Sequence, residues 1–249
     1  MIYIQKNNDG IPHHFDCACA MYGAIDLGLE YKLISFEELK SGKWDSLIKS
    51  NLFIGSVEFM TEVFNRVEIK QPKLPLNNFR PFIEMKIKDF KNLIDNNSNS
   101  EQKYFIKPKE IKAFTGFVVD KWSVTTLNSL NDDLDIFVQE VIDIESEWRI
   151  YVFRNKVVDI RQYSGELEAD VYGMVNFANK LLKNKEEKLK GFPSTFTIDM
   201  AIYKKHPKIR LKTVVEFNDM WAIGNYGISN DLYVRMLKER YFDIIKNKK

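Results

Sequence analysis

The chain is poor in cysteine, in long apolar runs and in net charge, and each shortage excludes a class of protein. Only two of its 249 residues are cysteines, Cys17 and Cys19. Residues so close together rarely bridge each other, so we expect no disulfide scaffold and a reducing compartment. No window approaches the length of a membrane span. A formal net charge of +2 gives no general attraction to nucleic acid or to a membrane, and we expect neither as a partner.

Signals of other familiar classes are also missing. Residues 1–10 lack the basic start and long apolar stretch of a signal peptide, which favours a cytoplasmic protein. The phosphate-binding pattern GxxxxGK[ST] is absent, and no Ser-His-Asp or Cys-His arrangement for a protein nucleophile is evident. The cluster His13-His14 with the two cysteines can ligate zinc. Without a second ligand cluster, a reduced apolar helix with flanking histidines is the favoured interpretation.

What the sequence does contain is an alternation of short strands and helices, with a break near residue 80. Three prolines within Gln71–Pro81 exclude a continuous helix or a central strand there, so we place a domain boundary in this segment. Residues 1–80 alternate strand and helix and are expected to form a small α/β unit. Residues 81–249 are expected to form the main domain, which is rich in strands from Lys103 onward.

Some elements of the main domain are defined well enough to be checked. Phe137–Ile142 is predicted to be a strand. Glu147–Phe153 and Lys156–Gln162 are predicted to pair as a hairpin through a tight turn at Arg154-Asn155. Val171–Lys190 is predicted to be one helix, amphipathic in its first half.

The most informative stretch is Thr213–Ile228, where an apolar, β-branched segment runs into Asn, Asp and Gly. Glu216 and Asn218 stand two residues apart in it, and residues i and i+2 of a strand point to the same face. A carboxylate and an amide oxygen side by side suit Mg2+. The upstream apolar strand Phe196–Ile202 carries Asp199, a lone acid that is costly to bury unless a cation or donor meets it. The three polar residues predict a metal–phosphate centre, and the alternative is acids paired with lysine or arginine.

Basic side chains near a glycine turn are candidates for binding phosphate. Lys107 lies in a predicted strand, and Lys109 and Lys112 follow it ahead of a Phe-Thr-Gly turn that ends at Gly116. Lysine cations beside such a turn can hold phosphate oxygens together with backbone N–H donors. The alternative is a solvated lysine-rich loop.

Two arginines in the predicted hairpin are further candidates. Arg149 and Arg161 can meet across the two strands and clamp an anion. The alternative is a pair of structural salt bridges with Asp143, Glu147 or Asp159. The preceding strand Phe137–Ile142 can offer backbone N–H and C=O groups to an adenine edge, or it can be an ordinary edge strand.

Taken in order, these segments resemble the ATP-grasp superfamily. The matching segments are FIKP with downstream lysines, QE before D, WR in a strand, R ahead of a turn, TIDMAI and VVEFND. The resemblance is closest to the clade named for one arginine and two lysines, which is found in bacterial and viral (phage) genomes. It covers Ile83–Lys249, and Gly55-Ser56 after an apolar strand resembles the subdomain in front. It implies an α+β, ATP-grasp fold: two α+β subdomains sandwich ATP, preceded by a small α/β subdomain.

The resemblance also implies a role for each candidate residue. Lys107 and Lys112 are the phosphate lysines, with Lys112 preferred over Lys109 because it precedes the Phe-Thr-Gly turn. Arg149 is the clade arginine, and Arg161 is a phosphate or acyl-phosphate arginine. The linker strand that meets adenine is formed by Gln139, Glu140, Val141 and Ile142, and the Mg2+ ligands are Asp199, Glu216 and Asn218. Apart from the resemblance, an acid such as Glu140 or Asp143 can lie near the exocyclic amine or the ribose.

The activity implied by the resemblance is that of an ATP- and Mg2+-dependent ligase. A carboxylate is activated as an acyl phosphate and is then attacked by an amine or a thiol. The partners are small-molecule or peptide carboxylates and amines that the sequence does not name. Candidates for lining their pocket are Trp221, which follows the metal segment, and Tyr226. The alternatives are a kinase of the same fold and a nucleotide-binding protein without catalysis. The glycine-rich phosphate loop of many relatives is short in this chain, with Gly116 alone in place.

Overall fold

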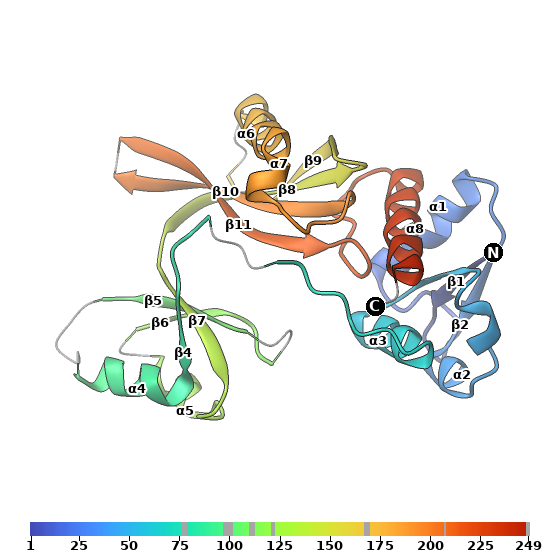
Figure 1. Ribbon diagram of the computed structural model, residues 1–249, viewed down its shortest axis with the longest axis horizontal. Coiled ribbons are helices and arrows are strands. Elements are labelled where there is room, and N and C mark those ends of the chain that lie inside the picture. Colours follow the sequence, from blue (N-terminus) through green and yellow to red (C-terminus); the bar gives the residue numbers. More distant parts are fainter. Residues whose placement is uncertain are drawn as a thin grey trace. The chain divides into compact units, whose positions relative to one another are not determined.

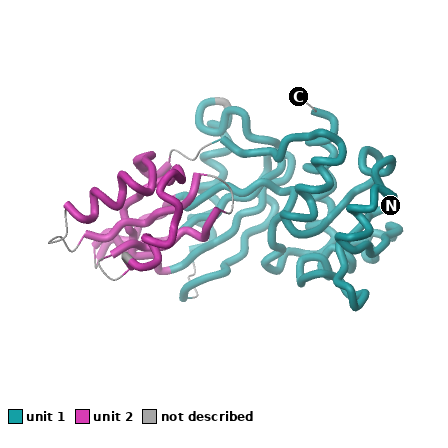
Figure 2. The backbone as a smooth tube through the Cα atoms, turned by 90° about the horizontal axis from the view of Figure 1, so that it is seen from below, with its two compact units in different colours: residues 1–76, 146–201, 214–249 teal, residues 77–145, 202–213 magenta. Residues whose placement is uncertain are grey.

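The computed structural model describes residues 1–75, 79–96, 102–109, 113–120, 123–166, 170–206 and 208–247. The chain divides into two compact units, shown in Figure 2. Unit 1 comprises residues 1–76, 146–201 and 214–249, and unit 2 comprises residues 77–145 and 202–213. The predicted division into residues 1–80 and 81–249 stays a prediction.

Unit 1 begins with a small parallel sheet flanked by helices, which is the predicted α/β arrangement (Figure 1). Its strands are β1 (Ile2–Gln5), β2 (Tyr31–Ile34) and β3 (Leu52–Ile54), in the order β2-β1-β3. The helices are α1 (Phe15–Asp26), α2 (Phe36–Lys40), the 3-10 turn η1 (Asp45–Leu47) and α3 (Val57–Arg66). Every residue of β1 and β3 is buried, as expected for parallel strands covered on both faces.

The last helix, α8 (Asn230–Lys246), returns to pack on α1. Gly23 of α1 makes this approach possible, because a Cβ atom there would overlap the backbone carbonyl of Asn230. Buried residues of α8, including Val234, join those of the parallel sheet in one hydrophobic core. The two ends of the sequence therefore stabilise each other.

The second sheet of unit 1 has the strand order β11-β10-β8-β9. Its strands are β8 (Asp143–Phe153), β9 (Lys156–Gly165), β10 (Phe196–His206) and β11 (Ile209–Asp219), of which β8, β10 and β11 extend into unit 2. The predicted hairpin of β8 and β9 is confirmed, with antiparallel pairing and positive φ angles of 51° and 61° at Arg154 and Asn155. Positive φ at both turn residues matches the right-handed twist of the strands.

The prediction of one helix over Val171–Lys190 is wrong. Helix α6 (Val171–Lys183) packs against β9 and ends at Asn184, and a separate short helix, α7 (Lys185–Lys188), follows. The Asn184 side chain donates to the carbonyl of Lys180 at 3.2 Å, so a local side-chain bond competes with continuation of the helix.

Unit 2 is an antiparallel sheet covered by two helices (Figure 1). Its strands are β4 (Ile83–Lys86), β5 (Tyr104–Pro108), β6 (Phe117–Val119) and β7 (Asp135–Glu140), in the order β4-β7-β5-β6. The helices are α4 (Ile87–Asn96) and α5 (Val124–Asn128). Ile87 and Phe90 of α4 share a buried core with Ile106 and Ile136 of the sheet. The strand predicted at Phe137–Ile142 begins two residues earlier and ends at Glu140.

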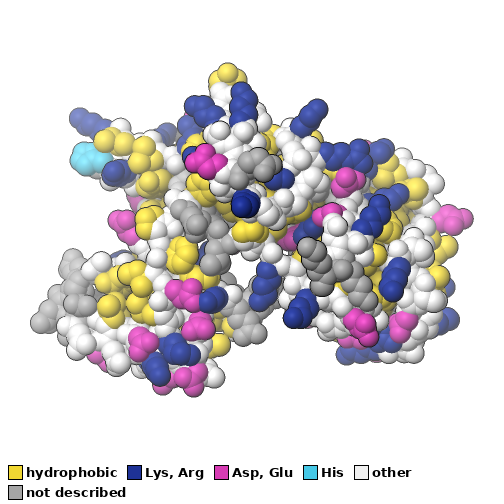
Figure 3. Space-filling model, viewed as in Figure 1, with side chains coloured by type: hydrophobic (Ala, Val, Ile, Leu, Met, Phe, Trp, Pro, Cys, Tyr) yellow, Lys and Arg dark blue, Asp and Glu magenta, His cyan; other side chains and the backbone are white. Residues whose placement is uncertain are grey.

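Lys and Arg side chains are interspersed with Asp and Glu on the face shown in Figure 3, without a broad field of one sign. Among the described residues, none of the helices combines the length and apolar character that a membrane crossing requires.

Candidate functional site

Arg149 of β8 and Asp199 of β10 form a two-pronged ion pair in unit 1. Nε of Arg149 donates to Oδ1 of Asp199 at 2.8 Å, and Nη2 donates to Oδ2 at 2.6 Å. The two residues are only 6% and 2% exposed. Of the two possibilities set out for Asp199, the described structure therefore shows the acid paired with an arginine.

The environment of this pair shifts both pKa values. Burial raises the pKa of Asp199 above its usual range, and the hydrogen bonds from Arg149 act in the opposite direction. Burial alone would lower the pKa of Arg149, but the ion pair with Asp199 holds it above its usual value. Arg149 is therefore charged at any working pH.

Glu216 and Asn218 of β11 lie side by side, as their spacing predicts, and complete what we call the carboxylate cluster (Arg149, Asp199, Glu216 and Asn218). Nδ2 of Asn218 donates to Oδ2 of Asp199 at 3.0 Å and to Oε1 of Glu216 at 3.1 Å. The carboxylates of Asp199 in β10 and Glu216 in β11 thus converge on one point, which the amide N–H2 group of Asn218 occupies.

Two tyrosines lie against the cluster. The rings of Tyr163 and Tyr226 stack at 5.0 Å with an interplanar angle of 16°. Cζ of Arg149 lies 4.4 Å from the Tyr226 ring centroid and 5.8 Å from that of Tyr163. Of the two, only Tyr226 was identifiable from sequence, because it follows the Glu216–Asn218 segment.

The loop that carries Tyr226 is held firmly. The backbone N–H of the buried residue Asn225 donates to Asp16 at 2.7 Å, and its carbonyl accepts from the Tyr151 hydroxyl at 2.6 Å. Its side chain accepts from the Gly227 N–H at 2.7 Å. Tyr226, with φ of +44°, is fixed in a conformation that few side chains adopt without such support.

Arg161 lies directly opposite Arg149 in the β8–β9 register, as the predicted hairpin requires. The two arginines do not hold a common acid in the described structure. Arg161 pairs with Asp159 at 2.7 Å, which is one of the salt bridges set out as the alternative, and its side chain is 41% exposed. The role of Arg161 toward a phosphate stays a prediction.

The lysine candidates belong to unit 2. Lys107 lies in β5 opposite Phe137 of β7 and is half-buried. Lys109 is exposed and forms an ion pair with Glu84, whose hydrogen bond raises the pKa of Lys109. Lys112 lies outside the described residues.

The segment predicted to meet adenine lines a cavity of about 840 Å³ in unit 2. This volume is in the range of small-molecule sites. All five predicted residues line it, namely Gln139, Glu140, Val141, Ile142 and Asp143. Val141 and Ile142 lie between the end of β7 and the start of β8.

Arg80 also lines this cavity, and sequence reasoning missed it. Its Nη2 donates to the carbonyl oxygen of Glu140 at 2.6 Å. Burial lowers the pKa of Arg80, while Tyr203 and Glu140 act to raise it. The residue lies in the proline-containing segment that was interpreted as a boundary, and its contact is with a residue 60 positions away.

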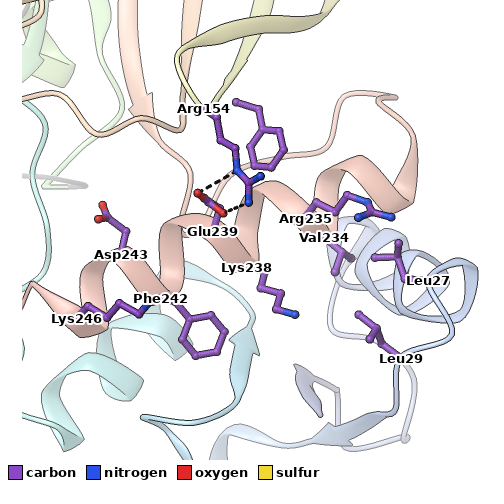
Figure 4. Close-up of a pocket in the computed structure, with 11 residues that line it drawn as sticks. Leu27, Leu29, Arg154, Val234, Arg235, Lys238, Glu239, Phe242, Asp243 and Lys246 are labelled. Carbon is purple, nitrogen blue, oxygen red and sulfur yellow. Dashed lines mark hydrogen bonds and ion pairs between the residues drawn. The ribbon is translucent and has the colours of Figure 1, made fainter.

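A second cavity, of about 690 Å³, lies in unit 1 beside α8 (Figure 4). Arg154 and Glu239 on its wall form an ion pair at 2.8 Å, drawn in the figure. No predicted site residue lines this cavity.

Comparison with known proteins places these features in a family. Residues 79–236 match the model of an ATP-grasp domain, family 2 of the clade named for one arginine and two lysines. No curated protein sequence matches the chain. Among solved structures, D-cycloserine synthetase DcsG has a TM-score of 0.58 at 9% identity, over 98% of this chain and 99% of that one.

Two further solved structures are similar at the level of the fold. D-alanine–D-alanine ligase from Bacillus anthracis has a TM-score of 0.52 at 12% identity, over 100% of this chain and 98% of that one. N5-carboxyaminoimidazole synthetase from Staphylococcus aureus has a TM-score of 0.52 at 11% identity, over 96% of this chain and 77% of that one. Such identities show a shared fold.

Proposed function

The chain belongs to the ATP-grasp superfamily, in the clade named for one arginine and two lysines, and from that premise we propose that it is an ATP- and Mg2+-dependent ligase. It would activate a carboxylate as an acyl phosphate, which an amine or a thiol then attacks. The observation that carries the proposal is the convergence of Asp199 and Glu216 on Asn218 within an ATP-grasp fold.

The donor set of the carboxylate cluster fits Mg2+. Among the described residues, no group of three His, Cys, Asp or Glu side chains is placed to hold a metal. The third protein ligand that we propose is the amide of Asn218. The oxygen and nitrogen of an amide exchange places by a half-turn of the group. After that half-turn, oxygen atoms of Asp199, Glu216 and Asn218 all face one spot, and Oδ2 of Asp199 keeps a lone pair beside its bond to Arg149.

The charge around the cluster also favours a cation. Burial raises the pKa of Tyr163, and the nearby carboxylates Asp199, Glu147 and Glu216 raise it further, while Arg149 opposes them. Three carboxylates against one guanidinium leave the site negative. Bound Mg2+ would offset this charge and neutralise phosphate oxygens.

Arg149 is the residue we propose to contact the transferred phosphoryl group. Its Nε and Nη2 are used by Asp199, and within the described chain its Nη1 donates to no other residue. Asp199 and Tyr226 thus fix the orientation of the guanidinium and leave one corner for an anion. Lys107, Lys112 and Arg161 are proposed to add positive charge for the phosphates.

The base would occupy the cavity of unit 2. Apolar residues such as Phe82 and Ile144 wall it, and the segment Gln139–Ile142 supplies backbone groups at its edge. Asp143 is proposed to meet the ribose. Positioning of this kind is most of what phosphoryl transfer requires, since no protein nucleophile is needed.

The proposed reaction has two steps. A carboxylate oxygen of the substrate attacks the γ-phosphorus of ATP, so that ADP leaves and an acyl phosphate forms. The amine then attacks the acyl carbon and loses a proton, and inorganic phosphate, which can take up that proton, leaves as the amide forms. Small-molecule and peptide acids both fit this scheme.

The test is ADP release from pools of carboxylates and amines, repeated with hydroxylamine as the acceptor. A ligase gives ADP together with a hydroxamate, because only an acyl phosphate reacts with hydroxylamine. ADP without hydroxamate would indicate a kinase, and ATP binding without turnover would indicate a nucleotide-binding protein; either result overturns the proposal. The surface variant Glu239→Gln should retain the wild-type rate, whereas Glu216→Gln should lose most of it.

A further inference from the structure

Arg80 presents more hydrogen-bond donors to the cavity of unit 2 than its observed contact uses. A guanidinium has five N–H donors, and one of these, on Nη2, is directed at the Glu140 carbonyl at 2.6 Å. This is the one hydrogen bond that Arg80 donates to another described residue. Its side chain is half-buried among the residues that line the cavity, so its remaining donors are available to a ligand there.

The contact places an acceptor and a donor next to each other at the cavity edge. The carbonyl oxygen of Glu140 has a second lone pair, and the guanidinium of Arg80 has further N–H groups within the same cavity. A ligand edge that offers a donor beside an acceptor complements this pair.

On the edge that carries N7, adenine offers such a pair and guanine does not. Adenine carries the N6 amino donor beside the N7 acceptor, whereas guanine carries two acceptors, O6 and N7. Guanine O6 would face the carbonyl oxygen of Glu140, and two acceptors repel each other. A base bound through its N7 edge therefore fits this part of the cavity as adenine and not as guanine.

We propose that Arg80 donates to N7 of the adenine ring while the Glu140 carbonyl accepts from N6, so that Arg80 is a specificity-determining residue of the nucleotide site. The assignment rests on the proposed function, because it requires that the cavity holds the base of ATP. It adds a residue from outside the segment Gln139–Ile142 to that site.

The test is a binding cycle with two ligands, ATP and 7-deaza-ATP, in which a C–H group replaces N7. Titration calorimetry with Mg2+ gives dissociation constants for the wild type and for Arg80→Ala. We expect wild type to bind 7-deaza-ATP about 10- to 100-fold more weakly than ATP, the effect of one hydrogen bond to a charged donor. Arg80→Ala should bind the two ligands equally, and GTP should bind wild type at least tenfold more weakly than ATP.

Control variants distinguish a failure of the Arg80 assignment from a failure of the proposed function. Arg80→Lys retains a charged donor of similar length and guards against loss of folding in the alanine variant, and both variants are checked by their urea midpoints. Arg154→Ala, on the surface of unit 1, should keep the wild-type preference for ATP. If wild type binds ATP and Arg80→Ala still discriminates against 7-deaza-ATP, the assignment of Arg80 is overturned. If wild type binds no ATP, the proposed function itself fails.

Discussion

The guanidinium of Arg149 holds both carboxylate oxygens of Asp199, at 2.8 Å and 2.6 Å, inside the second sheet of unit 1. Removing one partner leaves the other as an uncompensated buried charge. We predict that Arg149→Met lowers the free energy of unfolding by about 3–5 kcal/mol, measured by urea denaturation.

The hairpin itself supplies the matched control for this prediction. Arg161 lies directly opposite Arg149, but its pair with Asp159 is partly exposed, and such pairs contribute about 1 kcal/mol or less. Arg161→Met should therefore change the unfolding free energy little. Equal losses in the two variants would contradict the burial argument.

Stability should fall at alkaline pH because of Cys17. Burial raises the pKa of the Cys17 thiol to about 12, whereas an unfolded chain ionises cysteine near about 8.5. Between these values the unfolded chain releases a proton that the folded chain keeps, so the free energy of unfolding decreases as pH rises, by up to about 1.4 kcal/mol per pH unit.

The measurement is the urea midpoint at about pH 7.5 and pH 9.5 for wild type and for Cys17→Ala. Tyrosines begin to ionise in the unfolded chain at about pH 9.5, but they do so in both proteins and cancel in the comparison. The Cys17→Ala variant should have a lower urea midpoint at about pH 7.5, because a buried side chain is truncated. Between about pH 7.5 and pH 9.5, however, its midpoint should fall by less than that of wild type. An identical loss in both proteins would show that Cys17 is not responsible.

Gly23 should tolerate no side chain. A Cβ atom at this position would overlap the carbonyl of Asn230 in α8, and the clash is with backbone, which cannot rotate away. We expect Gly23→Ala to lower the free energy of unfolding by about 2–3 kcal/mol. At Gly224, a Cβ would meet its nearest neighbours at 3.7 Å, so Gly224→Ala should be close to wild type in the same thermal or urea experiment.

Local patterns predicted the local parts of the site. The i, i+2 spacing placed Glu216 beside Asn218, and the two positive-φ residues Arg154 and Asn155 close the predicted hairpin. The apolar pattern predicted the ends of elements less reliably. It predicted that the strand continues to Ile142, although β7 ends at Glu140 and the chain then passes to the strand β8 of another sheet.

The partner of Asp199 was not predictable, because it depends on the order of strands in the sheet. Arg149 reaches Asp199 since β8 lies between β9 and β10, and that order is set by packing between distant segments. The contact between Arg80 and Glu140 has the same origin. Such contacts leave no spacing signal in the sequence.

The central claim is that Asp199, Glu216 and Asn218 hold Mg2+ for ATP, and Glu216→Gln tests it most directly. This variant removes one charge and keeps the size of the side chain, and Glu216 forms no ion pair with the other described residues. Calorimetric titration of ATP with and without Mg2+ should show that Mg2+ strengthens binding to wild type and to the surface control Glu239→Gln. In Glu216→Gln that strengthening should fall by about 10- to 100-fold, the usual scale for weakening a metal site. Mg2+-dependent binding that is unchanged in Glu216→Gln would contradict the account.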